Sequence, residues 1–187
     1  IDEDAPEQTV NLAGITAGGS ETQPLAVTAV SSNASLIANP TVVYSSAAAT
    51  GSLKFTPLAD QNGTTTITVT VTDGGLDNNL ATTADNATTT HTFDVTVNSV
   101  NNLPTLAAIS NLAIDEDAAE QTVNLAGITA GGGETQPLRV TASSNNTNLV
   151  LDPAVTYTSA NTTGSIQFTP IADAMGSAVI TVTVEDG

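Results

Sequence analysis

The chain contains no cysteine and no tryptophan, and only two of its 187 residues, Lys54 and Arg139, are cationic. The absence of cysteine excludes disulfides, thiolate zinc sites and a thiol nucleophile. Nineteen acidic residues give a formal charge of −17, so no basic surface exists to neutralise phosphates, and nucleic-acid binding is excluded. No apolar run approaches the roughly 18 residues of a membrane-spanning helix, so this segment has no predicted membrane span.

Threonine is the most abundant residue, with 33 copies, and valine, asparagine and glycine are also frequent. Threonine and valine favour extended backbone on a pleated, half-buried surface, whereas asparagine, aspartate and glycine favour turns. No window sustains the apolar spacing of an amphipathic helix. The composition therefore predicts an all-β protein.

The sequence repeats itself at an offset of 113 residues. The opening Ile1–Ala5 recurs as Ile114–Ala118, and Asp73-Gly74 recurs as Asp186-Gly187. Across the 74 positions that can be compared, 50 are identical. A repeat of this length is a whole domain, because a solenoid turn would be about 20–50 residues. We predict two domains, residues 1–103 and 104–187.

The second copy has no counterpart of residues 75–113. We therefore expect the second domain to be truncated, without its final strand, and the chain to be a fragment of a longer tandem array. A sandwich that lacks its last strand exposes an unpaired edge, which a strand from an identical chain could complete. Truncation of the chain is the simpler interpretation of the same feature.

Short strands with regular spacing are predicted within the first copy. The expected ranges are 25–30, 41–44, 52–55, 64–72 and 90–97. In the fourth range, Ile67, Val69 and Val71 alternate with threonines at the period of a strand that has one buried face. Several such strands predict a sandwich of about 100 residues. Its core is expected to include Tyr44, Phe55 and Phe93.

The acidic residues far outnumber the cations that could pair with them. Most must therefore be solvated or share cations taken from solution. Carboxylate and amide oxygens are hard ligands, and Ca²⁺ accepts about 6–8 of them in flexible geometry. Zinc and copper are poor candidates without soft or imidazole ligands. The alternative interpretation is a solvated acidic surface that keeps an extracellular protein soluble.

Four segments in order resemble one known kind of repeat. Each copy opens with Ile-Asp-Glu-Asp, and the first copy continues with the segments 55–63 and 68–75. The junction between the copies reads Val97-Asn98-Ser99-Val100-Asn101-Asn102-Leu103-Pro104. Together these segments resemble the bacterial cadherin-like or Ig-like tandem repeats of large extracellular surface proteins, over nearly the whole chain. The resemblance implies a Greek-key β-sandwich in each copy.

In cadherins, Ca²⁺ sits between successive domains, and the resemblance implies a ligand set here. Glu3 and Glu116 are similar to the glutamate early in each domain, and Asp60 and Asp173 to the acid before the long threonine strand. Asp73 and Asp186 resemble the aspartate that ends that strand. The implied cluster joins Glu3, Asp60, Asn98, Asn101 and Asn102 with Asp186, and adds Asp115 and Asp117. Two linker positions that are usually aspartate are asparagine here, which implies weaker binding or fewer ions.

Two alternatives remain for these acids. Asp60 and Gly63 could simply form a turn, because aspartate caps its own backbone and glycine supplies a positive φ. A second metal site could instead lie in one acidic loop, made of Asp73, Asp77, Asn78, Asn79, Asp85 and Asn86.

Catalysis is not expected. His91 is the only imidazole, and no nucleophile elbow, phosphate loop or metal–histidine motif is present. The sequence favours a non-catalytic structural module of an extracellular or cell-surface adhesin, fibre or surface layer, stiffened by Ca²⁺ at the junction with neighbouring repeats of the same array. The alternative is a module that recognises glycans or proteins through its loops, for which the sequence has few aromatic residues.

Overall fold

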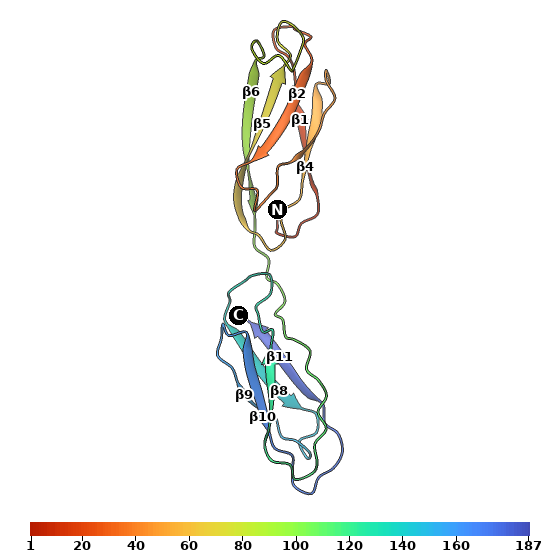
Figure 1. Cartoon of the computed structure of the whole chain (residues 1–187), viewed down its shortest axis with the longest axis vertical. Helices are drawn as coiled ribbons and strands as arrows, with labels where there is room; N and C mark the ends of the chain where they lie inside the picture. Colours follow the sequence, from red (N-terminus) through yellow and green to blue (C-terminus); the bar gives the residue numbers. More distant parts are fainter. The chain divides into compact units, whose positions relative to one another are not determined.

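The computed structural model describes all 187 residues and contains only β-strands, eleven in number (Figure 1). The predicted all-β class is confirmed. The chain divides into two compact units, Ile1–Val100 (unit 1) and Asn101–Gly187 (unit 2), so the boundary lies three residues before the predicted one. No helix in the structure is long and apolar enough to cross a membrane.

Unit 1 is a sandwich of two three-stranded antiparallel sheets. Its strands are β1 (Gln8–Ala13), β2 (Leu25–Ser31), β3 (Thr41–Val43), β4 (Thr50–Phe55), β5 (Gly63–Asp73) and β6 (Thr88–Val97). One sheet has the order β1-β4-β3 and the other β2-β5-β6. The ends of the five strands with predicted ranges agree with the prediction to within two residues.

The two sheets of unit 1 enclose one apolar core. Leu53 and Ile67 are fully buried, and Phe55 and Val97 contact the same cluster. Each such side chain contributes about 1.5–3 kcal/mol by leaving water. Phe93 is half-buried at the margin of this core, whereas Tyr44 is half-buried but lies outside the cluster. The threonines that alternate along β5 occupy its other face, which explains the period of the sequence.

Unit 2 repeats this arrangement with one strand fewer. Its strands are β7 (Gln121–Ala126), β8 (Leu138–Ser144), β9 (Ala154–Thr156), β10 (Thr163–Phe168) and β11 (Ile180–Asp186). The sheet β7-β10-β9 matches β1-β4-β3, but the second sheet contains only β8 and β11. The core is built around Leu125, Ile128, Val140 and Ile166. Within the 187 residues, no strand pairs with β11 as β6 pairs with β5.

Candidate functional site

Glu3 is the only charged side chain that the structure buries, with 4% of its surface exposed. Its backbone N–H donates to the carbonyl of Asn98 over 2.8 Å, and its Oε1 accepts a hydrogen bond from the N–H of Val100 over 2.9 Å. The segment that follows β6 therefore folds over the first residues of the chain. This contact brings together two of the predicted ligands, Glu3 and Asn98, although 95 residues separate them in sequence.

Further contacts fix the same end of unit 1. Asp2 forms a parallel bridge with Asn98, and the Asn98 amide donates to the Asp2 carboxylate over 3.2 Å. The Ile1 carbonyl accepts from the Asn98 N–H over 2.8 Å. Several hard oxygens therefore lie at this end, from Asp2, Glu3 and Asn98.

Asp60 lies in a turn that both units share. The N–H of Asp60 donates to the Asp4 carboxylate over 3.2 Å, and in unit 2 the N–H of Asp173 donates to Asp117 over 3.0 Å. Asp60 has a φ of 57° and Asp173 a φ of 56°, and the glycines three residues later also have positive φ. Aspartate and glycine are the residues that tolerate this region best. The geometry is that of the turn interpretation, which accounts for the recurrence of Asp60 as Asp173.

At the beginning of unit 2, the predicted ligands Asn101 and Asp186 are in contact. The Asn101 amide donates to the Asp186 carboxylate over 3.0 Å, and the Gln136 amide donates to the Asn101 side-chain oxygen over 2.6 Å. Asp186 ends β11, so the end of the strand fixes its position.

Glu134 also lies at this end of unit 2, and the sequence analysis missed it. Its carboxylate accepts a hydrogen bond from the N–H of Asn102 over 3.0 Å. The signal that could have found it is the internal repeat, because Glu134 recurs at the same offset as Glu21, each time after a glycine-rich segment.

The remaining predicted acids of unit 2 lie at its opposite end. Asp117 bonds to Asp173, before β11 begins, whereas Asp186 is the last residue of β11. Seven residues of strand place these ends about 20 Å apart. The prediction that Asp115 and Asp117 join Asp186 in one cluster is therefore wrong within unit 2. Glu116, the counterpart of the buried Glu3, is exposed because unit 2 has no strand like β6 to cover it.

The acidic loop between β5 and β6 uses its carboxylates to close turns. Asp73 Oδ1 accepts from the N–H groups of Gly75 and Ala87, over 3.0 Å and 2.9 Å. Asp85 accepts from the N–H of Leu76 over 2.8 Å, and Asp77 accepts from the N–H of Asn79 over 2.9 Å. These bonds supply a structural reason for all three acids in the second predicted metal site.

No group of three or more Asp, Glu or His side chains in the structure is arranged to hold a metal ion. Each predicted ligand pair within one unit, such as Glu3 with Asn98 or Asn101 with Asp186, therefore supplies only part of a calcium coordination shell, which needs about 6–8 oxygens. These groups provide oxygen ligands and negative charge.

Protein cations neutralise little of the acidic charge. The ion pairs are Lys54–Glu7 at 2.9 Å and Arg139–Glu185 at 3.5 Å, and all four side chains are largely exposed. Exposed pairs of this kind contribute about 0–1 kcal/mol. Most carboxylates therefore have no cationic side chain as a partner.

Comparisons with known proteins leave the family open. No protein-family model and no curated protein matches the chain. Among solved structures, it is similar to domains 4–9 of the surface layer protein SbsC, with 22% identity, a TM-score of 0.37, and coverage of 93% of this chain and 21% of that one.

The S-layer protein rSbsC(31-844) is 20% identical with a TM-score of 0.34, and the match covers 93% of this chain and 19% of that one. Domains 4 and 5 of SbsC are 22% identical with a TM-score of 0.31, and the match covers 93% of this chain and 69% of that one. The chain thus spans about a fifth of the first two structures. These TM-scores are too low to assign the chain to their family.

Proposed function

We propose that this chain is a non-catalytic structural module of an extracellular or cell-surface protein, and that Ca²⁺ bound at the junction between repeats stiffens it. The observation that carries this proposal is the burial of Glu3 at the end of unit 1 where the chain passes to the next repeat. A buried carboxylate is costly unless it is paired, hydrogen-bonded or bound to a metal.

Neither of the two cationic side chains forms an ion pair with Glu3. Val100 donates one N–H to its carboxylate, while Asp2 and Asn98 add further oxygens nearby. Lys54 and Arg139, the two cationic side chains, are paired with Glu7 and Glu185. A divalent cation would compensate the buried charge, and it would favour oxygen ligands of this kind.

Binding to oxygens from both repeats would stabilise only the arrangement that presents them together. The proposed ligands are Glu3, Asp60 and Asn98 of unit 1 with Asn101, Asn102 and Asp186 of unit 2. Because an ion that binds one state stabilises that state by mass action, calcium would fix the angle between neighbouring repeats. Three neutral asparagines lower the ligand charge, so we expect an affinity in the range of extracellular modules, about 10⁻⁴–10⁻³ M.

A structural role also agrees with the aromatic side chains. Phe55 is buried, and Tyr44, Phe93, Tyr157 and Phe168 are half-buried. Glycan recognition commonly uses exposed aromatic faces, which these side chains do not provide. The acidic surface, with a formal charge of −17, keeps such a module soluble and makes it responsive to divalent cations.

Calcium titration calorimetry on the whole chain tests this proposal with a matched pair of variants. Glu3→Gln removes the buried charge but retains an acceptor for the N–H of Val100. Glu116→Gln makes the same change at the equivalent, exposed position of unit 2. We expect Glu3→Gln to weaken calcium binding severalfold and Glu116→Gln to leave it unchanged.

Two results would overturn the proposal. If titration of the unaltered chain with Ca²⁺ gives no heat above that of Mg²⁺ at equal ionic strength, the chain has no specific calcium site. Equal weakening by Glu3→Gln and Glu116→Gln would show that calcium binds diffusely to the acidic surface instead of at Glu3.

A further inference from the structure

The linker that opens unit 2, residues 101–107, is held against that unit by direct hydrogen bonds. The Asn101 amide donates to the Asp186 carboxylate over 3.0 Å, and the backbone N–H of Asn102 donates to the Glu134 carboxylate over 3.0 Å. Gln136 completes the group, because its Nε2 donates to the Asn101 side-chain oxygen over 2.6 Å. We name Glu134, Gln136 and Asp186 the linker clamp.

A second set of contacts holds the linker a few residues further on. The N–H of Thr105 donates to the carbonyl of Thr129 over 2.9 Å, and the N–H of Ala107 donates to the carbonyl of Ala126 over 2.9 Å. Leu106, between these two residues, packs against the core of unit 2. The linker is therefore anchored at two points on the same unit.

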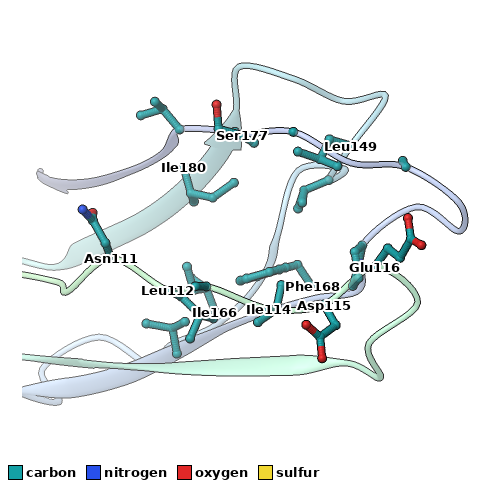
Figure 2. A pocket seen from close by; sticks show the side chains of 18 of the residues that line it. Asn111, Leu112, Ile114, Asp115, Glu116, Leu149, Ile166, Phe168, Ser177 and Ile180 are labelled. Carbon is teal, nitrogen blue, oxygen red and sulfur yellow. The ribbon is translucent and has the colours of Figure 1, made fainter.

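The chain that follows the linker also stays against unit 2. Leu112 and Ile114 line the same hollow as Ile166 of β10, and Figure 2 shows these three side chains. The segment from Asn101 onward is therefore a part of unit 2, in agreement with the division of the chain at this residue.

Glycine allows the linker to approach the backbone of unit 2 closely. Gly131 has a φ of 90°, and a Cβ at this position would overlap the carbonyl of Leu103. Gly18, at the equivalent position of unit 1, has a φ of 89°, and a Cβ there would meet no atom within 4 Å. Both backbone conformations favour glycine, but only Gly131 lies under the linker.

Asparagine suits position 101 because this side chain donates and accepts at the same time. An ionised aspartate only accepts hydrogen bonds, so Asp186 requires the NH₂ group of Asn101. The Asn101 oxygen then faces Gln136, whose NH₂ group is the donor. An aspartate at position 101 would have no N–H for Asp186 and would place a second negative charge beside it. The contact therefore favours asparagine over aspartate.

We propose that the linker clamp fixes the linker to unit 2 through these hydrogen bonds and requires no metal ion to do so, and that Glu134 and Gln136 are the residues that position the two linker asparagines. This inference goes beyond the proposed calcium site, because the bonds join protein groups only. For a calcium ion at the junction, the clamp holds the unit 2 ligands in place beforehand, so less conformational entropy is lost on binding.

The clamp also limits the part of the junction that can bend. The N–H of Val100 is bonded to Glu3 in unit 1, and the side chain of the next residue, Asn101, is bonded in unit 2. The backbone dihedrals between these two anchored residues are therefore the main place where the junction bends.

Amide hydrogen exchange of the whole chain in chelator tests the clamp in the absence of calcium, so its failure is distinguishable from failure of the proposed calcium site. The Asn102 amide is the best reporter, because its bond to Glu134 is partly buried whereas the bonds of Asn101 are exposed. We expect this amide to exchange at least about tenfold more slowly than it does in an unstructured peptide with the sequence of the linker.

Gln136→Leu and Gln23→Leu form the first matched pair of variants. Gln23 is the counterpart of Gln136 and is equally half-buried, but its Nε2 donates to Glu21 over 3.2 Å instead of to a linker residue. Gln136→Leu should speed exchange of the Asn102 amide about tenfold, and Gln23→Leu should leave it unchanged.

Gly131→Ala and Gly18→Ala form the second pair. Both variants meet the same backbone strain at a φ near 90°, but only Gly131→Ala displaces the linker. Exchange of the Asn102 amide should therefore rise only in Gly131→Ala. The amides of β7 and β10 report whether unit 2 stays folded, and Gln136→Leu, which keeps the glycine, remains informative if Gly131→Ala unfolds it.

Asn101→Asp and Asn101→Ala separate the charge from the lost hydrogen bond. Both variants remove the donor to Asp186, and only Asn101→Asp adds a like charge beside it. Exchange of the Asn102 amide should rise in both variants and more in Asn101→Asp. The difference between them should shrink at about 1 M salt, because salt screens exposed charges.

The proposal fails on any of three results. Exchange of the Asn102 amide at the rate of the unstructured peptide would show that the linker is not held. Equal effects within either matched pair would show a general loss of stability instead of a lost linker contact. Exchange in Asn101→Asp as slow as in the unaltered chain would show that the bond to Asp186 does not hold the linker.

Discussion

Four aspartates hold a backbone conformation that most residues avoid. Asp4, Asp60, Asp117 and Asp173 have φ between 56° and 61°, and they form two equivalent pairs, one in each unit. Aspartate is among the few non-glycine residues enriched in this region. The conformation alone explains why these residues recur, whether or not a metal binds beside them.

Substitutions at Asp60 separate the backbone role from a side-chain role. In calcium-free buffer, Asp60→Ala should lower the free energy of unfolding by about 1 kcal/mol, because alanine is strained at positive φ. Asp60→Gly should be close to neutral, since glycine adopts a φ of 57° readily. Urea denaturation measures both. If Asp60→Gly proves as destabilising as Asp60→Ala, the side chain and not the backbone carries the effect.

Asp73 is expected to hold the loop between β5 and β6. Its carboxylate accepts two backbone N–H groups, so Asp73→Ala leaves both donors without this partner and should cost about 1.5–3 kcal/mol. Asp73→Asn keeps an acceptor at the same place and should cost less. Hydrogen exchange of the Gly75 and Ala87 amides measures the local effect. Unchanged protection in Asp73→Ala would contradict this role.

At the scale of the strand, β5 and β11 provide a comparison within one molecule. They share five consecutive residues, but only β5 is covered by a third strand. The same isoleucine is fully buried in one unit and half-buried in the other. The burial of this isoleucine therefore depends on whether a neighbouring strand covers it, and not on the sequence of the strand that carries it.

Alanine substitution of this isoleucine in each unit measures the difference. Ile67→Ala removes a fully buried side chain and should destabilise unit 1 by about 2–5 kcal/mol. Ile180→Ala should cost unit 2 clearly less, because the side chain already contacts solvent. The measurement is denaturant unfolding followed by amide signals of each unit. Equal losses in the two units would contradict the account of this difference in burial.

The strands of this chain were predictable because threonine and valine alternate at the period of the sheet. The alternation of apolar residues with threonine at Ile67, Val69 and Val71 predicted the two ends of β5 to within one residue. The contact of Glu3 with Val100 was not predictable from spacing, because it depends on how the end of β6 folds over the first residues. The internal repeat marks Glu134 as the counterpart of Glu21, but its contact with Asn102 depends on the fold of unit 2.

For the whole molecule, the main feature is a charge of −17 with two exposed ion pairs to offset it. The resemblance to cadherin-like repeats assigned ligands from their order in the sequence. In the structure Glu3 bonds to Asn98 and Asn101 bonds to Asp186, whereas Asp117 lies at the other end of unit 2 from Asp186. The order of residues in the sequence therefore proposed candidate ligands, and the geometry within each unit shows which of these residues are in contact.

The most direct test of the central claim is the thermal unfolding of the whole chain in chelator, in millimolar Mg²⁺ and in millimolar Ca²⁺ at equal ionic strength. With a dissociation constant of about 10⁻⁴–10⁻³ M, calcium at about 1 mM would stabilise the folded state by about 0.4–1.4 kcal/mol. For units of this size, each kcal/mol raises the melting temperature by about 4–8 °C. The account predicts a rise of this order in Ca²⁺ and a much smaller one in Mg²⁺. The same melting temperature in all three buffers would contradict it.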